Sequence, residues 1–148
     1  MELKELYQEI ILDHGKSPKN KGQCDNFNLQ AKGHNPLCGD KVHIYLKLNK
    51  EQIVDDISFE GEGCAISLAS ASILTETIKG KNFNISKRII KDFLNMIKNE
   101  TNLTINSLTK DQQTTIMSLS GVKKFPMRVK CATMAWHTLT SALEGKKK

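Results

Sequence analysis

Three cysteines and one aspartate occur in short motifs whose residue types suit metal or sulfur chemistry. Cys38 and Asp40 are separated by one glycine in NPLCGD, Cys64 follows Gly-Glu-Gly, and Cys131 lies in RVKCATMAW. A bend at Gly39 can bring the first two side chains to the same side of the chain. Three thiolates and one carboxylate make four ligands, the number that closes a tetrahedron around zinc.

The types of these donors narrow the choice of metal. Sulfur-rich tetrahedral sites suit zinc or iron–sulfur clusters rather than magnesium or calcium. A permanent structural zinc is more usually held by cysteine and histidine alone, so the carboxylate of Asp40 suggests a site that changes its ligands. Cys64 and Cys131 are both expected near helix starts, where the thiolate form is favoured. A structural zinc module with an unrelated binding role stays open at this point.

Two cations precede the third cysteine of the motifs. Arg128 and Lys130 lie three positions and one position before Cys131. An arginine there can pair with Asp40, or with a thiolate displaced when the ligands of the metal change. The plainer interpretation of the same residues is a solvated, basic helix start.

Two further residues have no assigned chemistry. Cys24 lies outside the three motifs, in a segment rich in turn-forming residues, and we expect an incidental thiol, with a spare sulfur acceptor as the alternative. The sequence assigns no role to His137, which follows Trp136 in the last expected helix.

The periodicity of apolar residues predicts an α+β domain in which these motifs lie at the ends of helices and strands. A helix, a group of short strands and then several helices favour a three-stranded antiparallel sheet with one face covered. We expect Gly15 to end the first helix and Ser86 to cap the helix expected over residues 86–99. The expected helices are 3–14, 64–79, 86–99, 114–119 and about 127 or 131 to 143, and the expected strands are 28–32, 41–49 and 53–59.

Composition limits the classes of function. The 148 residues fit one domain, and the chain has neither a signal-peptide core nor an apolar run of membrane-spanning length, so we expect a cytoplasmic protein without a membrane partner. A net charge of +6 brings nucleic acid into consideration. The basic residues are scattered, however, and the few aromatics do not alternate with them, so we expect no nucleic-acid partner.

Together these motifs resemble a known family. NPLCGD, FEGEGCAISLASASILTE and GVKKFPMRVKCATMAWHTL resemble the motifs of the SufU branch of the U-type (IscU/NifU N-terminal) iron–sulfur cluster assembly family. YQEIILDHGKSPKNKG is similar to the opening helix and loop of that family. The resemblance implies one domain over residues 1–148, with a small antiparallel sheet packed by helices and a metal site at one end. It assigns the metal or cluster ligands as Cys38, Asp40, Cys64 and Cys131.

Two features favour the SufU branch over the IscU scaffold branch. The scaffold branch typically has histidine immediately before its third cysteine, where this chain has Lys130. The SufU branch also carries an insertion between the second and third cysteines, which here are 67 positions apart, and we expect the extra length within 82–120.

The resemblance to SufU implies a zinc-dependent sulfurtransferase that works with a PLP-dependent, SufS-like cysteine desulfurase. A histidine of that partner would take the place of Cys38 on zinc, and the freed thiolate would accept persulfide sulfur, with Arg128 steering Asp40 or the thiolate. The alternative is a scaffold that carries a [2Fe–2S] cluster on the same four ligands. In either case downstream iron–sulfur assembly proteins would be partners.

Overall fold

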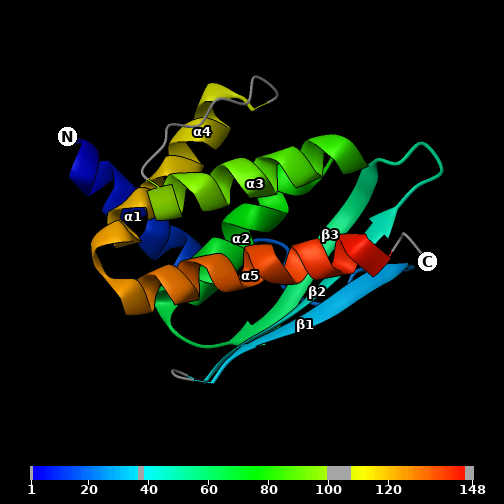
Figure 1. Ribbon diagram of the computed structural model, residues 1–148, viewed down its shortest axis with the longest axis horizontal. Helices are drawn as coiled ribbons and strands as arrows, with labels where there is room; N and C mark the ends of the chain where they lie inside the picture. The colour runs from blue at the N-terminus through cyan, green and yellow to red at the C-terminus, as the bar shows by residue number, and fades with distance from the viewer. Residues whose placement is uncertain (1, 37–38, 100–107, 146–148) are drawn as a thin grey trace.

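The computed structural model describes residues 2–36, 39–99 and 108–145, and it forms a three-stranded sheet with helices packed against it (Figure 1). This arrangement confirms the predicted α+β class. In the part of the chain that the structure describes, no helix is both long and apolar enough to span a bilayer. The elements in chain order are α1 Leu3–Lys16, β1 Leu29–Asn35, β2 Asp40–Leu48, β3 Val54–Glu62, α2 Ala65–Ile78, α3 Phe83–Asn99, α4 Lys110–Met117, the 3-10 helix η1 Ser118–Lys124, and α5 Pro126–Glu144.

The sheet has the strand order β1-β2-β3, and both pairs are antiparallel. The sequence of β2 alternates apolar Val42, Ile44 and Leu46 with other residues, which predicts one buried face, and these three side chains do lie in the core. The β1–β2 register pairs Asn35 with Asp40, so the start of β2 lies at one end of the sheet.

Helices α2 and α5 cover one face of the sheet, and α5 crosses it along its length (Figure 1). A Cβ atom at Gly33 of β1 would lie 2.0 Å from Thr138 Oγ1, so the glycine allows α5 to approach this edge strand closely. Between the helices, Trp136 stacks on Phe93 with ring centroids 4.0 Å apart and donates from Nε1 to Ser70 Oγ at 2.9 Å. These contacts fix the rotation of α5, which carries Cys131.

The opposite face of the sheet is partly covered by the segment between α1 and β1. Tyr45, which alternation places on the solvent side, is only 5% exposed. The ring of Phe27 packs edge-on against it at 5.0 Å, and the Cys24 backbone N–H donates to Ser58 Oγ at 2.8 Å. Cys24 is therefore buried on the face away from α2 and α5, and this burial raises the pKa of its thiol.

Three predicted helix boundaries are wrong, each for a local reason. The helix expected at 114–119 begins at Lys110, because Thr109 and Gln112 form a capping box there. Gly15 does not end α1, which continues to Lys16. A Cβ atom at Gly15 would lie 3.3 Å from the carbonyl oxygen of Ala65, so this glycine lets α1 approach the start of α2. Ser86 is not a cap: it is fully buried inside α3, and the side chain of Asn82 accepts the Ile85 N–H at 2.8 Å instead.

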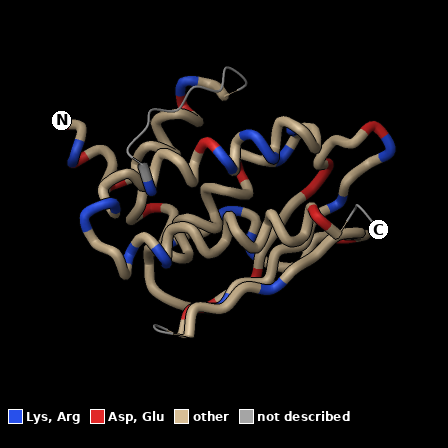
Figure 2. The backbone as a smooth tube through the Cα atoms, in the orientation of Figure 1, with Lys and Arg blue, Asp and Glu red and all other residues tan. Residues whose placement is uncertain are grey.

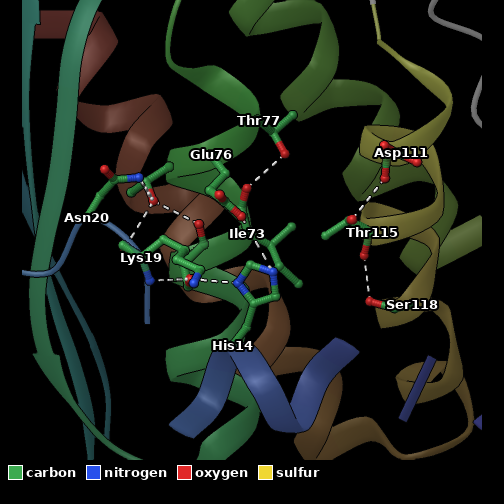
Figure 3. A network of polar contacts seen from close by, with 11 residues as sticks. His14, Lys19, Asn20, Ile73, Glu76, Thr77, Asp111, Thr115 and Ser118 are labelled. Atoms are coloured by element: carbon green, nitrogen blue, oxygen red, sulfur yellow. Dashed lines mark hydrogen bonds and ion pairs between the residues drawn. The ribbon is translucent and has the colours of Figure 1, made fainter. Parts of the chain in front are cut away.

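A group of polar contacts, here called the α1–α2 polar cluster, holds α1 and the loop after it against α2 (Figure 3). His14 Nδ1 lies 2.7 Å from Ser72 Oγ, and the Lys19 backbone N–H donates to the same hydroxyl at 2.7 Å. His14 Nε2 lies 3.6 Å from a carboxylate oxygen of Glu76. The cluster consists of His14, Lys19, Asn20, Ser72, Thr75 and Glu76.

Candidate metal centre

Three of the four predicted ligands converge at one end of the sheet. Asp40 begins β2, Cys64 is the N-cap residue of α2, and Cys131 lies in the second turn of α5. One ligand atom from each of the three lies within 4.8 Å of the other two. Bonds of about 2.0 to 2.3 Å to a tetrahedral ion place neighbouring ligand atoms about 3.3 to 3.8 Å apart. The three ligand atoms would therefore need to approach one another by about 1.5 Å at most to bind zinc. The fourth predicted ligand, Cys38, lies outside the described residues.

The carboxylate of Asp40 is fixed from two sides. It is 1% exposed, its Oδ1 accepts the Cys64 backbone N–H at 3.1 Å, and its Oδ2 accepts a hydrogen bond from the Ser67 hydroxyl. The sulfur of Cys64 lies 3.6 Å from the same Oδ2. These contacts hold the carboxylate beside the Cys64 sulfur, the arrangement that two ligands of one ion need.

Gly63 makes room for this carboxylate. Its φ of +152° lies in a region that side-chain-bearing residues rarely adopt, and a Cβ atom there would lie 2.3 Å from Asp40 Oδ1. The Gly-Glu-Gly turn therefore does more than reverse the chain, because its second glycine leaves the space that the buried carboxylate occupies.

The two described thiols of the centre differ in accessibility. Cys64 is exposed, whereas Cys131 is only 6% exposed. The prediction that Cys64 lies at a helix N-terminus is confirmed. Cys131 lies close to the start of α5, as expected, but in its second turn, where the backbone N–H groups are already bonded within the helix, so the free N–H groups of the N-terminus do not favour its thiolate.

The cations before Cys131 are both exposed on α5. Arg128 lies in the first turn, and among the described residues it does not form an ion pair with Asp40. His137 is exposed further along the same helix and is not among the residues that converge on the centre. Desolvation, and after it the charge of Lys98, lowers the pKa of its ring. Cys24 is buried with Ser58, on the other face of the sheet.

Sequence reasoning missed Ser67, which links two of the predicted ligands. Its hydroxyl donates to Asp40 Oδ2 and also lies 3.5 Å from the carbonyl oxygen of Cys131. A usable signal was present, since residues three apart on a helix share a face and Ser67 follows Cys64 by three positions. The small-residue pattern of α2 concealed it, because serine there also fits close helix packing.

Comparisons with known proteins identify relatives over most of the chain. The chain is 42% identical over 134 residues to the zinc-dependent sulfurtransferase SufU of Bacillus subtilis (strain 168), covering 90% of this chain and 86% of that protein. It is 34% identical to the iron–sulfur cluster assembly scaffold protein IscU of Streptococcus pyogenes serotype M1, over 96% of this chain and 85% of that protein. The crystal structure of FiSufU from Fervidobacterium islandicum AW-1 superposes with a TM-score of 0.80 at 34% identity, covering 94% and 97% of the two chains.

The family profile described as the NifU-like N terminal domain matches residues 6–146. This match includes all four predicted ligand positions. The chain therefore belongs to the NifU-like N-terminal domain family, the SufU- and IscU-type proteins of iron–sulfur cluster assembly.

Proposed function

We propose that this protein is a zinc-dependent sulfur carrier, with Cys38, Asp40, Cys64 and Cys131 as the zinc ligands. The observation that carries the proposal is the convergence of ligand atoms from Asp40, Cys64 and Cys131 within 4.8 Å. The choice of zinc is supported by the sulfur-rich donor set and by the name of the Bacillus subtilis relative.

In this proposal Cys38 is the residue that receives sulfur from a cysteine desulfurase. Bound zinc would supply the positive charge that keeps the coordinating thiols deprotonated at neutral pH. The thiolate of Cys38 attacks the outer sulfur of a persulfide on the partner. The bond between the two persulfide sulfurs breaks, a new sulfur–sulfur bond forms on Cys38, and the partner's cysteine leaves as a thiolate.

In this proposal Asp40 helps to hold the zinc ion, and Arg128 assists the transfer of sulfur. Asp40 is fixed by the Cys64 N–H and the Ser67 hydroxyl, so its carboxylate is already oriented before any ion binds. We assign Arg128 the role of steering Asp40 or the freed Cys38 thiolate, since its exposed side chain lies in the first turn of α5.

A cluster scaffold is the second candidate function. It is supported by the name of the Streptococcus pyogenes relative and by a donor set that also suits a [2Fe–2S] cluster. We favour the carrier because Lys130 occupies the position where the scaffold branch typically has histidine. We also propose that the chain is one domain whose extra length lies within 82–120, which includes α3 and α4.

The test measures zinc content, desulfurase activity and the site of sulfur transfer together. Protein purified in air should contain about one zinc ion per chain and should accelerate a cognate cysteine desulfurase. Cys38→Ala should abolish the acceleration. The matched control is Cys24→Ala, which removes a thiol whose pKa is raised by burial on the far face and should keep full activity.

Mass spectrometry after incubation with desulfurase and cysteine should locate the added sulfur on Cys38. Normal stimulation by Cys38→Ala would overturn the carrier proposal. Assembly of iron and sulfide on the anaerobic protein, followed by cluster transfer to an apo-acceptor without any stimulation of the desulfurase, would favour the scaffold.

A further inference from the structure

A groove runs along α5 next to the metal centre, between the end of β1 and the end of α3. Its volume is about 860 Å³. Asn35, which pairs with Asp40 across the β1–β2 register, lines one part of the groove, and Lys130, the neighbour of Cys131, lines another. The groove therefore opens beside the centre without using Asp40, Cys64 or Cys131.

The charged side chains that line the groove are all positive among the described residues. The described residues that line it include no aspartate or glutamate. Within the described part of the chain, none of its four lysines takes part in an ion pair. The cationic and imidazole residues that line it are Lys32, Lys98, Lys123, Lys130, His34 and His137.

The same positive character continues onto α3. A second groove of about 490 Å³ lies between α3 and α5 and shares Lys98 with the first. Lys87, Arg88 and Lys91 line it, again without a carboxylate among its described lining residues. Figure 2 shows basic positions recurring along α3 and at the start of α5. A chain segment that entered the first groove would therefore meet further cations as it passed Lys98.

The floor of the first groove decides what kind of anion fits. Ile97, Val129 and Met134 contribute apolar side chains to it, and no phenylalanine, tyrosine or tryptophan is among its described lining residues. Nucleic acid bound by stacking is typically held on such large aromatic platforms, and the two imidazoles of the groove are small by comparison. An apolar floor bordered by lysines instead complements a peptide that carries both apolar and acidic side chains.

The geometry points to a docking site for an acidic segment of a partner protein, with apolar side chains on the floor of the groove and carboxylates facing Lys98 and Lys130. The segment would bring its protein to the edge of the metal centre. This inference stands on the shape and charge of the groove and holds whether the centre carries sulfur or a cluster.

The test uses the full chain and a short fluorescein-labelled peptide in which Leu alternates with Glu, followed by fluorescence anisotropy. The groove variant is Lys98→Glu with Lys130→Glu. The matched control is Lys4→Glu with Lys50→Glu, which changes the net charge equally at two exposed lysines outside the grooves. We expect the groove variant to weaken binding about tenfold relative to the control variant, because two attractions become repulsions.

Two further arms separate the contributions of charge and floor. A peptide with Gln in place of Glu should bind much more weakly, and so should a peptide with Ser in place of Leu. Amide shift changes on titration should centre on Ile97, Val129 and Met134. Zinc content should be equal in both protein variants, so that a failure here is distinguishable from a failure of the metal-centre proposal.

Three results would overturn the inference. Equal peptide binding by the two charge variants would show that net charge alone attracts the probe. Undiminished binding of the Ser-containing peptide would remove the role of the floor. Tighter binding of a labelled single-stranded RNA than of the peptide, with the same dependence on Lys98 and Lys130, would assign the groove to nucleic acid instead.

Discussion

Two polar clusters are built on the two halves of α2, and they differ in the charge that their side chains carry. In the α1–α2 polar cluster, Ser72 Oγ meets His14 and the Lys19 N–H, so a neutral ring and a backbone donor satisfy it. At the metal centre, Ser67 donates to a buried carboxylate that also lies beside the Cys64 sulfur. In the first cluster the one carboxylate, Glu76, already faces the His14 ring, whereas the second gathers a carboxylate and thiols that become anionic and therefore favours a cation.

The largest effect should follow from removing the buried carboxylate. Asp40→Ala should weaken zinc binding by about 3 kcal/mol, which is roughly a quarter of the free energy of a structural zinc site and about a 100-fold change in affinity. Competition with a chromophoric chelator measures it. His14→Ala, in the other cluster, should leave zinc affinity unchanged, and a comparable loss there would mean that the two clusters are coupled.

The α1–α2 polar cluster should instead determine folding stability. His14→Ala should lower the free energy of unfolding by about 2 kcal/mol, because it removes a buried ring and a partner of Ser72. Urea denaturation of the metal-free protein checks this. The matched control is His34→Ala, at an exposed position, which should change stability by less than about 0.5 kcal/mol. Equal effects of the two variants would contradict the structural role of His14.

A smaller effect should separate Ser67 from Ser72, although both are buried serines of one helix. Ser67→Ala should weaken zinc binding about tenfold, since partners that orient a ligand typically contribute at this level. Ser72→Ala should leave zinc affinity unaltered and destabilise the fold. The absorption bands of the cobalt-substituted protein give a second readout, and they should change for Ser67→Ala alone. An unaltered Ser67→Ala protein would show that Asp40 is held by the Cys64 N–H without help.

The smallest effect concerns pH. Burial lowers the pKa of His14 below its ordinary value of 6.5, against the opposing influence of Glu76 and Asp13 and with a small contribution from Lys19. Below pH 6.5 the unfolded chain then binds the proton more readily than the folded chain, so stability falls as the pH drops through that value toward the lower folded pKa. Metal-free wild-type protein should lose more stability between pH 7.5 and 5.5 than His14→Gln. Parallel losses would exclude His14 as the source.

Much of the fold could be predicted from local patterns. The alternation in β2 placed Val42, Ile44 and Leu46 correctly, because one face of a sheet must be dry. Errors arose where a tertiary contact decides the outcome. Gly15 remains helical because α2 lies against it, and Tyr45 is buried because a distant loop folds over the sheet.

The centre shows the same limit. Motif spacing selected Asp40, Cys64 and Cys131, which the structure brings together. It could not reveal that Ser67 orients the carboxylate, because that contact joins residues 27 positions apart in the chain. Nor could it reveal the space that Gly63 leaves for Asp40, which depends on a backbone angle rather than on a residue type.

The unequal exposure of Cys64 and Cys131 gives the described part of the centre a solvent-facing side and a buried side. Cys64 faces solvent, whereas Asp40 and Cys131 lie behind it. A scavenging chelator or an alkylating reagent would reach Cys64 long before Cys131, since reaction requires access to the sulfur. Among the described ligands, Cys64 is therefore the one that a competing chelator would displace first from a bound ion.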